Sequence, residues 1–270
     1  MKALTRETPE SRSWIYDELL EGDIRLPTVE GFSVRDNEVT ALFERLKSTV
    51  DIKKWSEREV SEWVQTKDCK DDWLDRCVLA TSLEIPLYLV LWQHDEEKFR
   101  ILLVSIENED RIVTKDKKLF LSCENLAKWL SNLKGIPVSK PFVTPKRLSS
   151  IDECLRLYGV PWPGNLDGFL LNPKTSEISV LLELRRTRVY SVRKHNLNDY
   201  FHKDYHGWEA LDILRNQLSI PLYILTWSSK ETLVKIQKLH KITKTGLDYE
   251  KIEFVEKTEI VPFFRQFMKA

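Results

Sequence analysis

The sequence lacks several features that would place it in common protein classes. It has no run of about 18 apolar residues and no recognisable secretory signal, so we expect a cytoplasmic protein that does not cross a membrane. It has no P-loop, GxGxxG or GxSxG sequence, so nothing supports nucleotide hydrolysis or serine-hydrolase chemistry. Its four cysteines include no CxxC pair, a pattern typical of reduced thiols in a cytosolic protein.

Charge is balanced over the whole chain but not along it. The 270 residues include 42 basic and 42 acidic side chains. Residues 1–135 hold 21 basic and 27 acidic ones, whereas residues 136–270 hold 21 and 15. A basic second half would attract nucleic acid, and an acidic first half would suit a basic protein partner. The two halves would also attract each other. The sequence does not tell which oligomeric state the protein has.

Two segments are so alike that we infer a tandem duplication. Residues 73–92 read WLDRCVLATSLEIPLYLVLW, and residues 208–227 read WEALDILRNQLSIPLYILTW. The offset is 135 residues, and neighbouring matches have offsets from 134 to 139. Such a period is the size of a small domain and far longer than a solenoid repeat. The predicted domains are therefore residues 1–134 and 146–270, joined by a linker at 135–145 that contains prolines.

Each repeat has the pattern of an α/β fold. Helical spacing of apolar residues predicts helices near 11–21 and 149–158. The apolar run that begins with IPLY predicts a strand in the middle of a sheet, with its Trp and Tyr side chains in the core. The predicted order is helix, two strands, a third strand near 188–192 in the second repeat, helix, buried strand, outer strand and helix. Helices packed on a mixed sheet make each repeat an α/β sandwich.

Two acidic positions recur in both repeats and mark a candidate site. Glu30 and Asp167 each precede a Gly-Phe pair at a strand start, and Glu44 and Glu183 each end the next strand. An antiparallel hairpin would bring the two carboxylates of a repeat to the same end of the sheet. Mg²⁺ would offset their repulsion, because it prefers oxygen ligands and keeps waters that can react. Arg185, two residues after Glu183, would point to the same face.

The order of elements around these acids resembles the PD-(D/E)XK nuclease superfamily. Each repeat, and so most of the chain, would then be a restriction-endonuclease-like mixed-sheet sandwich with flanking helices, in tandem. The resemblance implies that Asp167 and Glu183 bind Mg²⁺ or Mn²⁺ and that Arg185 stands at the position of the family's lysine. It also implies that Glu153 matches an acid that some members carry on the preceding helix.

Both repeats depart from the family's pattern. Arginine stays protonated and cannot act as a base, although it can hold a phosphate. In the first repeat Leu46 stands two residues after Glu44, so we expect that repeat to be inactive, with Glu30 and Glu44 as degenerate counterparts. The acids also have purely structural interpretations, because an acid before glycine commonly caps a turn and a Glu followed by Arg at a strand end is commonly a surface pair.

Two functions follow from the resemblance. One is a metal-dependent DNA endonuclease with its site in the second repeat, where Asp167, Glu183 and Arg185 would be catalytic. The other is a catalytically inactive nuclease-fold protein that serves as a scaffold for nucleic acid or for another protein. Metal binding by the two acids would distinguish them, because only the enzyme needs it.

The stretch LRRTRVYSVRKH directly follows the candidate site and is the densest basic patch. Its cations surround a tyrosine, and such mixtures suit phosphate contacts combined with stacking. The candidate nucleic-acid-binding residues are Arg186, Arg188, Arg193 and Lys194. The same stretch is also consistent with an ordinary solvated strand and loop. His202 and His206 would form a zinc pair if they shared a helix, but no third ligand cluster accompanies them.

Overall fold

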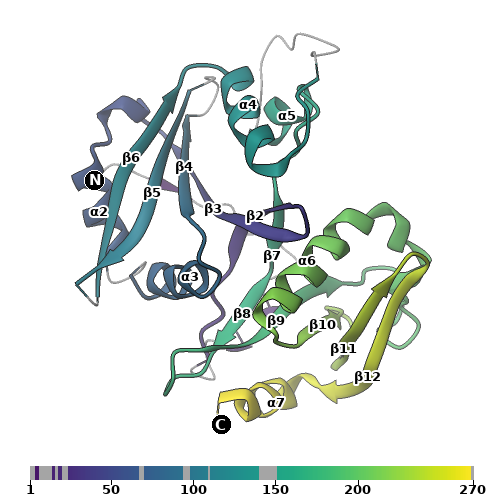
Figure 1. The fold of residues 1–270 in the computed structure, drawn as a ribbon. Coiled ribbons are helices and arrows are strands. Elements are labelled where there is room, and N and C mark those ends of the chain that lie inside the picture. The colour runs from purple at the N-terminus through teal and green to yellow at the C-terminus, as the bar shows by residue number, and fades with distance from the viewer. Residues whose placement is uncertain are drawn as a thin grey trace. The chain divides into compact units, whose positions relative to one another are not determined.

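The computed structural model describes residues 4–5, 14–15, 18–19, 24–66, 70–93, 98–108, 110–139 and 151–268 (Figure 1). It has helices and two mixed sheets, which confirms the predicted α/β class. The chain divides into two compact units: unit 1 comprises residues 1–7 and 29–165, and unit 2 comprises residues 8–28 and 166–270. In the part of the chain that is described, no helix is both long enough and apolar enough to span a membrane.

The sheet of unit 1 has the strand order β6-β5-β4-β3-β2-β7. Its strands are β2 (Val29–Arg35), β3 (Glu38–Ser48), β4 (Leu87–Gln93), β5 (Phe99–Glu107), β6 (Arg111–Phe120) and β7 (Gly164–Leu166), and β1 (Leu4–Thr5) pairs with β3. Strands β3 and β4 run parallel, whereas β2-β3, β4-β5 and β5-β6 run antiparallel. The helices of this unit are α2 (Glu57–Val64), α3 (Lys70–Ser82), α4 (Cys123–Lys134) and α5 (Ile151–Arg156).

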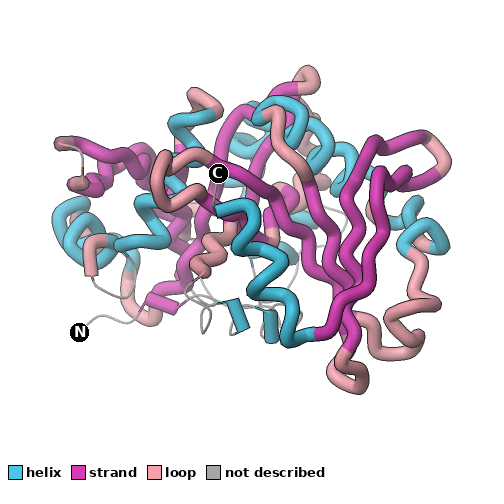
Figure 2. The backbone as a smooth tube through the Cα atoms, turned by 90° about the horizontal axis from the view of Figure 1, so that it is seen from below, coloured by secondary structure: helices cyan, strands magenta, loops and turns pink. Residues whose placement is uncertain are grey.

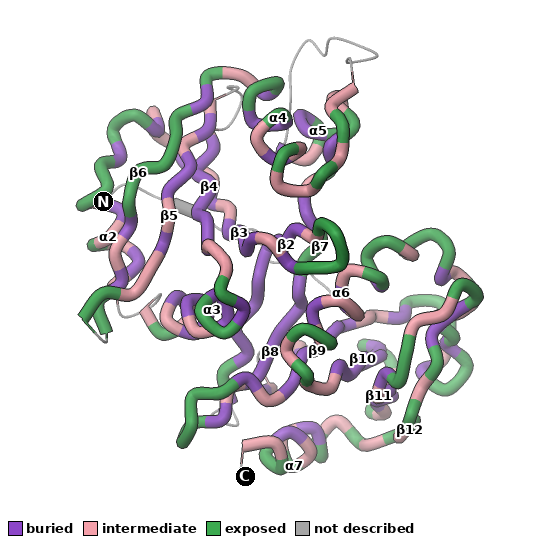
Figure 3. Tube along the Cα trace, in the orientation of Figure 1, coloured by how far each residue is buried: buried purple, intermediate pink, exposed green. Residues whose placement is uncertain are grey.

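The sheet of unit 2 has the strand order β12-β11-β10-β9-β8. Its strands are β8 (Gly168–Leu171), β9 (Ile178–Arg186), β10 (Leu222–Trp227), β11 (Leu233–Thr243) and β12 (Gly246–Glu256). Its helices are α6 (Tyr205–Leu218) and α7 (Ile260–Arg265), with the 3₁₀ turns η2 (Leu197–Asp199), η3 (Phe201–Lys203), η4 (Lys257–Glu259) and η5 (Gln266–Met268). Figure 2 distinguishes the strands and helices of both units by colour. Strands β9 and β10 are largely buried, whereas the edge strand β12 is much more exposed (Figure 3).

The two sheets pair their central strands in corresponding registers. In unit 1, Gly31 pairs with Phe43, and Glu44 pairs with Leu89. In unit 2, Gly168 pairs with Leu182, and Glu183 pairs with Ile224. These partners have the same offsets of 137, 139 and 135 residues that align the two halves of the sequence. The similarity of the halves therefore extends to their backbone pairing.

The first helical segment of each predicted repeat belongs to the opposite compact unit. Ile15 and Leu19 lie in the core of unit 2, together with Leu182 and Leu184 of β9. Helix α5 lies in the core of unit 1, although the repeat at 146–270 includes it. The compact units therefore differ in their bounds from the predicted domains. Of the predicted linker, residues 135–139 belong to unit 1, and residues 140–145 lie outside the described part of the chain.

This exchange removes the charge asymmetry that the sequence halves show. Unit 1 contains 23 basic and 24 acidic residues, and unit 2 contains 19 and 18. The acidic segment 8–28 belongs to unit 2, and the basic segment 136–165 belongs to unit 1. The net charge of a unit therefore gives no reason for it to attract a polyanion, and any such attraction must come from local clusters of charge.

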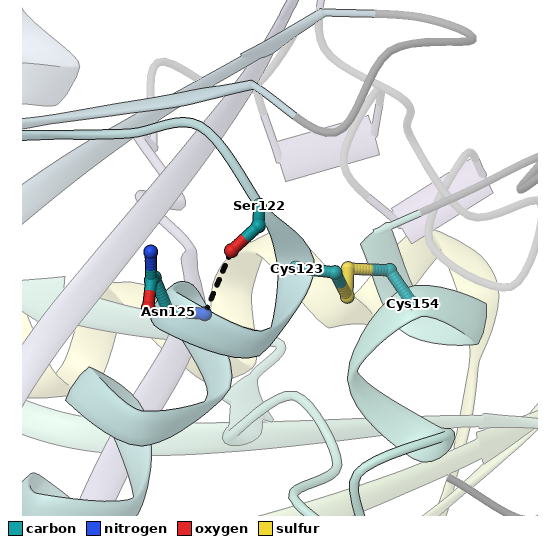
Figure 4. Close-up of a disulfide and its surroundings, with 4 residues drawn as sticks. All are labelled: Ser122, Cys123, Asn125 and Cys154. Atoms are coloured by element: carbon teal, nitrogen blue, oxygen red, sulfur yellow. Dashed lines mark hydrogen bonds between the residues drawn. A yellow bond between two sulfur atoms is a disulfide. The ribbon is translucent and has the colours of Figure 1, made fainter.

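A disulfide joins the exchanged helix α5 to α4 (Figure 4). The Cα atoms of Cys123 and Cys154 are 5.8 Å apart, within the usual range for this bond. The prediction of reduced thiols is wrong for these two residues, because it rested on the absence of a CxxC pair. Helix α5 packs in unit 1, and this packing brings the sulfurs together. Cys77 is a buried free thiol, and Cys69 lies outside the described residues.

Most of the predicted central elements are present. The Trp and Tyr side chains of β4 and β10 are buried, which confirms that they belong to the core. The predicted third strand is wrong, because residues 188–194 form bends and turns. The hydroxyl groups of Thr187 and Ser191 bond to nearby backbone groups there, so the chain satisfies its polar atoms locally and not in a strand ladder. Of the predicted helix near 11–21, only residues 14–15 and 18–19 are described.

Candidate functional site

The β8-β9 hairpin brings the two acids of unit 2 together. Asp167 immediately precedes β8, and the pairing of Gly168 with Leu182 places it beside Glu183. Both acids are buried. Asp167 Oδ2 accepts a hydrogen bond from the backbone N–H of Leu184 at 2.8 Å, which holds this carboxylate against β9. The sequence pattern therefore located a real pair of neighbouring buried carboxylates.

The cation next to these acids is the guanidinium of Arg185. Its Nη2 lies 3.0 Å from Glu183 Oε1, and its Nη1 lies 3.5 Å from Asp204 Oδ2. Its guanidinium carbon lies 4.7 Å from the ring centroid of Trp208, at a distance typical of a cation–π contact. Burial works to lower the pKa of Arg185, but the charges of Glu183, Asp167 and Asp204 outweigh it and raise the pKa. Arg185 therefore stays charged beside both acids.

Unit 1 contains an equivalent ion pair that is built from a different element. Arg76 of α3 places its Nε 3.0 Å from Glu44 Oε1, and the two side chains are only 2% and 1% exposed. The guanidinium carbon of Arg76 lies 5.3 Å from the ring centroid of Trp73. Trp73 is the sequence counterpart of Trp208. In both units, then, an arginine contacts the second acid and the matched tryptophan.

The two arginines occupy corresponding places but stand at different positions of the repeat. The counterpart of Arg185 in the first repeat is Leu46, and the counterpart of Arg76 in the second repeat is Leu211. Both leucines are buried. In unit 1 the helix carries the arginine and the strand carries the leucine. In unit 2 the strand carries the arginine and the helix carries the leucine. The arginine that pairs with the second acid can therefore come from either the strand or the helix.

The two acids of unit 1 are associated with different cations. Glu30 Oε2 lies 3.4 Å from Arg45 Nε, and Arg45 Nη1 lies 2.8 Å from Asp152 on α5. The backbone N–H of Glu30 donates to Glu44 Oε1 at 3.1 Å. These carboxylates therefore take part in ion pairs within unit 1, and the arginine that pairs with Glu30 also pairs with Asp152 of the exchanged helix α5.

The predicted magnesium ligands do not form a ready-made cage for a metal ion. Among the described residues, no group of three or more His, Cys, Asp or Glu side chains is arranged to hold one. Glu153 belongs to unit 1, whereas Asp167 and Glu183 belong to unit 2. A divalent cation next to Glu183 would also meet the positive charge of Arg185 at close range. As arranged, these residues do not fit a magnesium ion.

The predicted histidine pair is divided between two elements. His202 lies in the 3₁₀ turn η3, and His206 lies in α6, so they do not share one helical face. His206 is exposed, and its Nδ1 lies 3.5 Å from Glu209 Oε2. The spacing of four residues therefore does not produce the arrangement that zinc would need.

The predicted nucleic-acid-binding residues fall into two groups. Arg186 is on β9 and points away from the Arg185 face, where its guanidinium carbon lies 5.3 Å from the Trp227 ring centroid. The other three are exposed in the segment 187–195, which we call the basic loop: Arg188, Arg193 and Lys194. Arg193 lies with its guanidinium carbon 4.7 Å from the ring centroid of Phe254, on β12.

A second buried polar cluster, which the sequence did not predict, lies on the Arg185 face of the sheet. The strand registers align Arg185 with Thr226, and Thr226 with Lys235 of β11. Lys235 Nζ donates to the backbone oxygen of His195 at 2.9 Å, and Tyr200 Oη lies 2.6 Å from His195 Nε2. Burial lowers the pKa of His195, and the charges of Lys235 and Arg185 lower it further. A lysine in an alternating strand was the only sequence signal for this cluster.

Neither of two comparisons with known proteins finds a match for this chain. A scan against models of protein families finds no match, and a search of curated proteins finds none either. What the protein does is therefore inferred from its residues and their geometry.

Proposed function

We propose that this protein is a non-catalytic relative of the PD-(D/E)XK nucleases that binds nucleic acid through unit 2. The observation that carries the proposal is the arginine next to the second acid in both units. Arg76 contacts Glu44, and Arg185 contacts Glu183, each at 3.0 Å. The two arginines come from different elements, so the same charge arrangement has been reached in two ways.

A permanently charged arginine is a poor component of a hydrolytic centre. It cannot take a proton from water, because its guanidinium stays protonated. It also neutralises the carboxylate that a metal ion would need, and a metal ion would have to displace it. The ion pair is instead what a buried acid requires for stability once the metal site has been lost.

The basic loop is the part of unit 2 that would contact nucleic acid. It lies at the end of β9, beside the loop between β10 and β11. Val192 N–H in the basic loop donates to Glu231 Oε1 in that neighbouring loop at 2.9 Å. Arg193 and Lys194 are exposed and form no ion pair with a described residue. Exposed cations in this loop would attract phosphates, even though unit 2 as a whole is nearly neutral.

The second candidate function is a metal-dependent DNA endonuclease. The observation that favours it is the close placement of Asp167 and Glu183 at one end of the sheet, both of them buried. This function would require Arg185 to move away from Glu183, or to hold the scissile phosphate from its present place. The acidic pair alone is common to both candidates, so a direct test of activity is needed.

Two assays on the same preparation distinguish the candidates. A supercoiled plasmid is incubated with the protein and with Mg²⁺ or Mn²⁺, alongside the variants Asp167→Ala and Glu183→Ala. We expect no metal-dependent nicking by any of the three proteins. Metal-dependent nicking that both substitutions abolish would overturn the proposal and establish the endonuclease.

Binding is measured by fluorescence anisotropy with labelled DNA and RNA over a range of salt concentrations. We expect binding that weakens with salt, because phosphate contacts release counterions from the nucleic acid. Each contact contributes roughly 0.7 to 0.9 to the slope of log affinity against log salt concentration, which we call the salt slope. The triple variant Arg188→Ala, Arg193→Ala, Lys194→Ala should lower that slope by about 2 to 3. A matched control removes three cations elsewhere on unit 2, at Lys241, Lys244 and Lys251, and should bind as the original protein does. A protein that binds neither DNA nor RNA would overturn the proposed function.

A further inference from the structure

The basic loop and the edge strand β12 present four exposed apolar side chains. Two are in the basic loop, Val189 at 85% and Tyr190 at 62% exposure. Two are on β12, Ile252 at 47% and Phe254 at 37% exposure. The contact of Arg193 with the Phe254 ring connects the loop to the strand. Exposed apolar side chains that gather in one area are more typical of an interaction surface than ones that are scattered singly.

The backbone of the basic loop is held in place, so Tyr190 is presented from a braced turn. Thr187 Oγ1 donates to the backbone oxygen of Tyr190 at 2.8 Å, and the backbone N–H of Tyr190 lies 3.3 Å from the same hydroxyl oxygen. The backbone N–H of Thr187 donates to the backbone oxygen of Trp227 at 2.9 Å, which ties the turn to the end of β10. A braced loop loses less conformational entropy when it binds a ligand.

The backbone position of Phe254 is also fixed. Phe254 is paired in the sheet with Lys235 of β11, and Lys235 Nζ donates to the backbone oxygen of His195 at the end of the basic loop. Tyr190 and Arg193 are three residues apart, a span of at most about 11 Å of chain. Arg193 therefore contacts one ring and lies near the other along the chain, and we call these three residues the aromatic platform: Tyr190, Arg193 and Phe254.

We infer that the aromatic platform binds single-stranded nucleic acid by stacking unpaired bases on Tyr190 and Phe254. This inference rests on the proposed function and specifies its ligand. Aromatic rings offer a stacking surface to any base, but a duplex hides the base faces inside its own stack. Cations beside the rings can hold the backbone of the strand while the bases stack, and Arg193 can itself stack against a base. A duplex could contact only the cations of this surface.

The test compares a labelled 12-nucleotide polythymidine strand with a 12-base-pair duplex at one salt concentration. We expect the intact protein to bind the single strand more tightly. Tyr190→Ala and Phe254→Ala should each weaken single-strand binding by roughly 5- to 150-fold, the range that corresponds to losing one stacked base. Both should leave duplex binding nearly unchanged. Tyr190→Phe should bind the single strand as the intact protein does, because it keeps the ring.

The controls are Val189→Ala and Ile252→Ala, which remove exposed aliphatic side chains next to the rings. Both should bind the single strand as the intact protein does, and circular dichroism should show that every variant is folded. Equal losses for single strand and duplex on removing either ring would overturn the inference but leave the proposed function standing. A protein that binds neither would overturn both. Binding to vesicles of anionic phospholipid that depends on Val189 and Tyr190, with no preference for single strands, would also overturn the inference.

Discussion

Moving the arginine of unit 1 from its helix to its strand tests whether the two ion pairs are equivalent. The first step is Arg76→Leu, which leaves Glu44 buried without its arginine partner. The second step adds Leu46→Arg, which places the cation two residues after the acid, as Arg185 is placed in unit 2. Because the register of β3 with β4 matches that of β9 with β10, the new arginine starts from the corresponding backbone position.

The structure sets the expected size of the first step. The Arg76 and Glu44 side chains are almost fully buried, with Nε and Oε1 3.0 Å apart. Removing one partner of such a pair typically costs about 3–5 kcal/mol, because the remaining charge stays out of water. For a unit of this size each kcal/mol lowers the melting temperature by about 2–4 °C, so we expect a fall on the order of 10 °C. Leu46→Arg alone should also destabilise, because it adds a second buried cation and excess volume.

Urea and thermal unfolding of the single and double variants complete a double-mutant cycle. We expect the double variant to recover at least half of the stability that Arg76→Leu loses. The mirror pair in unit 2, Arg185→Leu combined with Leu211→Arg, is the matched control and should behave in the same way. The reasoning would be refuted if the double variant were no more stable than Arg76→Leu, or if Arg76→Leu cost less than about 1 kcal/mol.

Three further predictions follow from other buried groups. Replacing Cys123 and Cys154 by serine should lower the stability of unit 1 by about 3–4 kcal/mol in the chain-entropy model, since the bond joins residues 31 apart. Peptide mapping under non-reducing conditions should find this pair linked. Native alkylation should also leave Cys77 unmodified, because burial raises its pKa to about 12; labelling of all three thiols would contradict both statements. Burial lowers the pKa of His195 below 6.5, so the unfolded chain binds a proton more readily and stability should fall as pH drops below about 6.5. His195→Gln should remove that part of the pH dependence in urea unfolding at pH 5 to 8, and an unchanged pH dependence would count against it.

Several elements that the sequence did not predict still carried a local signal. Helix α2 begins with a capping box, in which Ser56 accepts from the backbone N–H of Glu59 and the Glu59 side chain accepts from the backbone N–H of Ser56. Strand β12 alternates in burial, but it is so rich in charged residues that it resembles a solvated loop. Such charges are typical of an edge strand, where they oppose pairing with another chain. These elements were missed because their apolar pattern is weak, although a capping box marks the start of α2 and dense charge marks β12 as an edge strand.

The sequence by itself determined the parts of this protein that depend on local pattern. The apolar runs of β4 and β10 define buried central strands, and the Gly-Phe and Glu positions define a hairpin with two acids at one end. These features require only the alternation of side chains along a strand and the burial of apolar surface, both of which are readable within a few residues.

Only the tertiary structure decided what the acids contact and which segments form a unit. Arg76 and Glu44 are 32 positions apart, and no local pattern shows that they meet. The exchange of the first helical segments, the Cys123–Cys154 bond and the near-neutral charge of each unit all follow from which helix covers which sheet. Both first helical segments carry buried apolar residues at helical spacing, Ile15 and Leu19 in one and Ile151 and Leu155 in the other. The choice between them is made by the packing of the whole chain and not by any segment of its sequence.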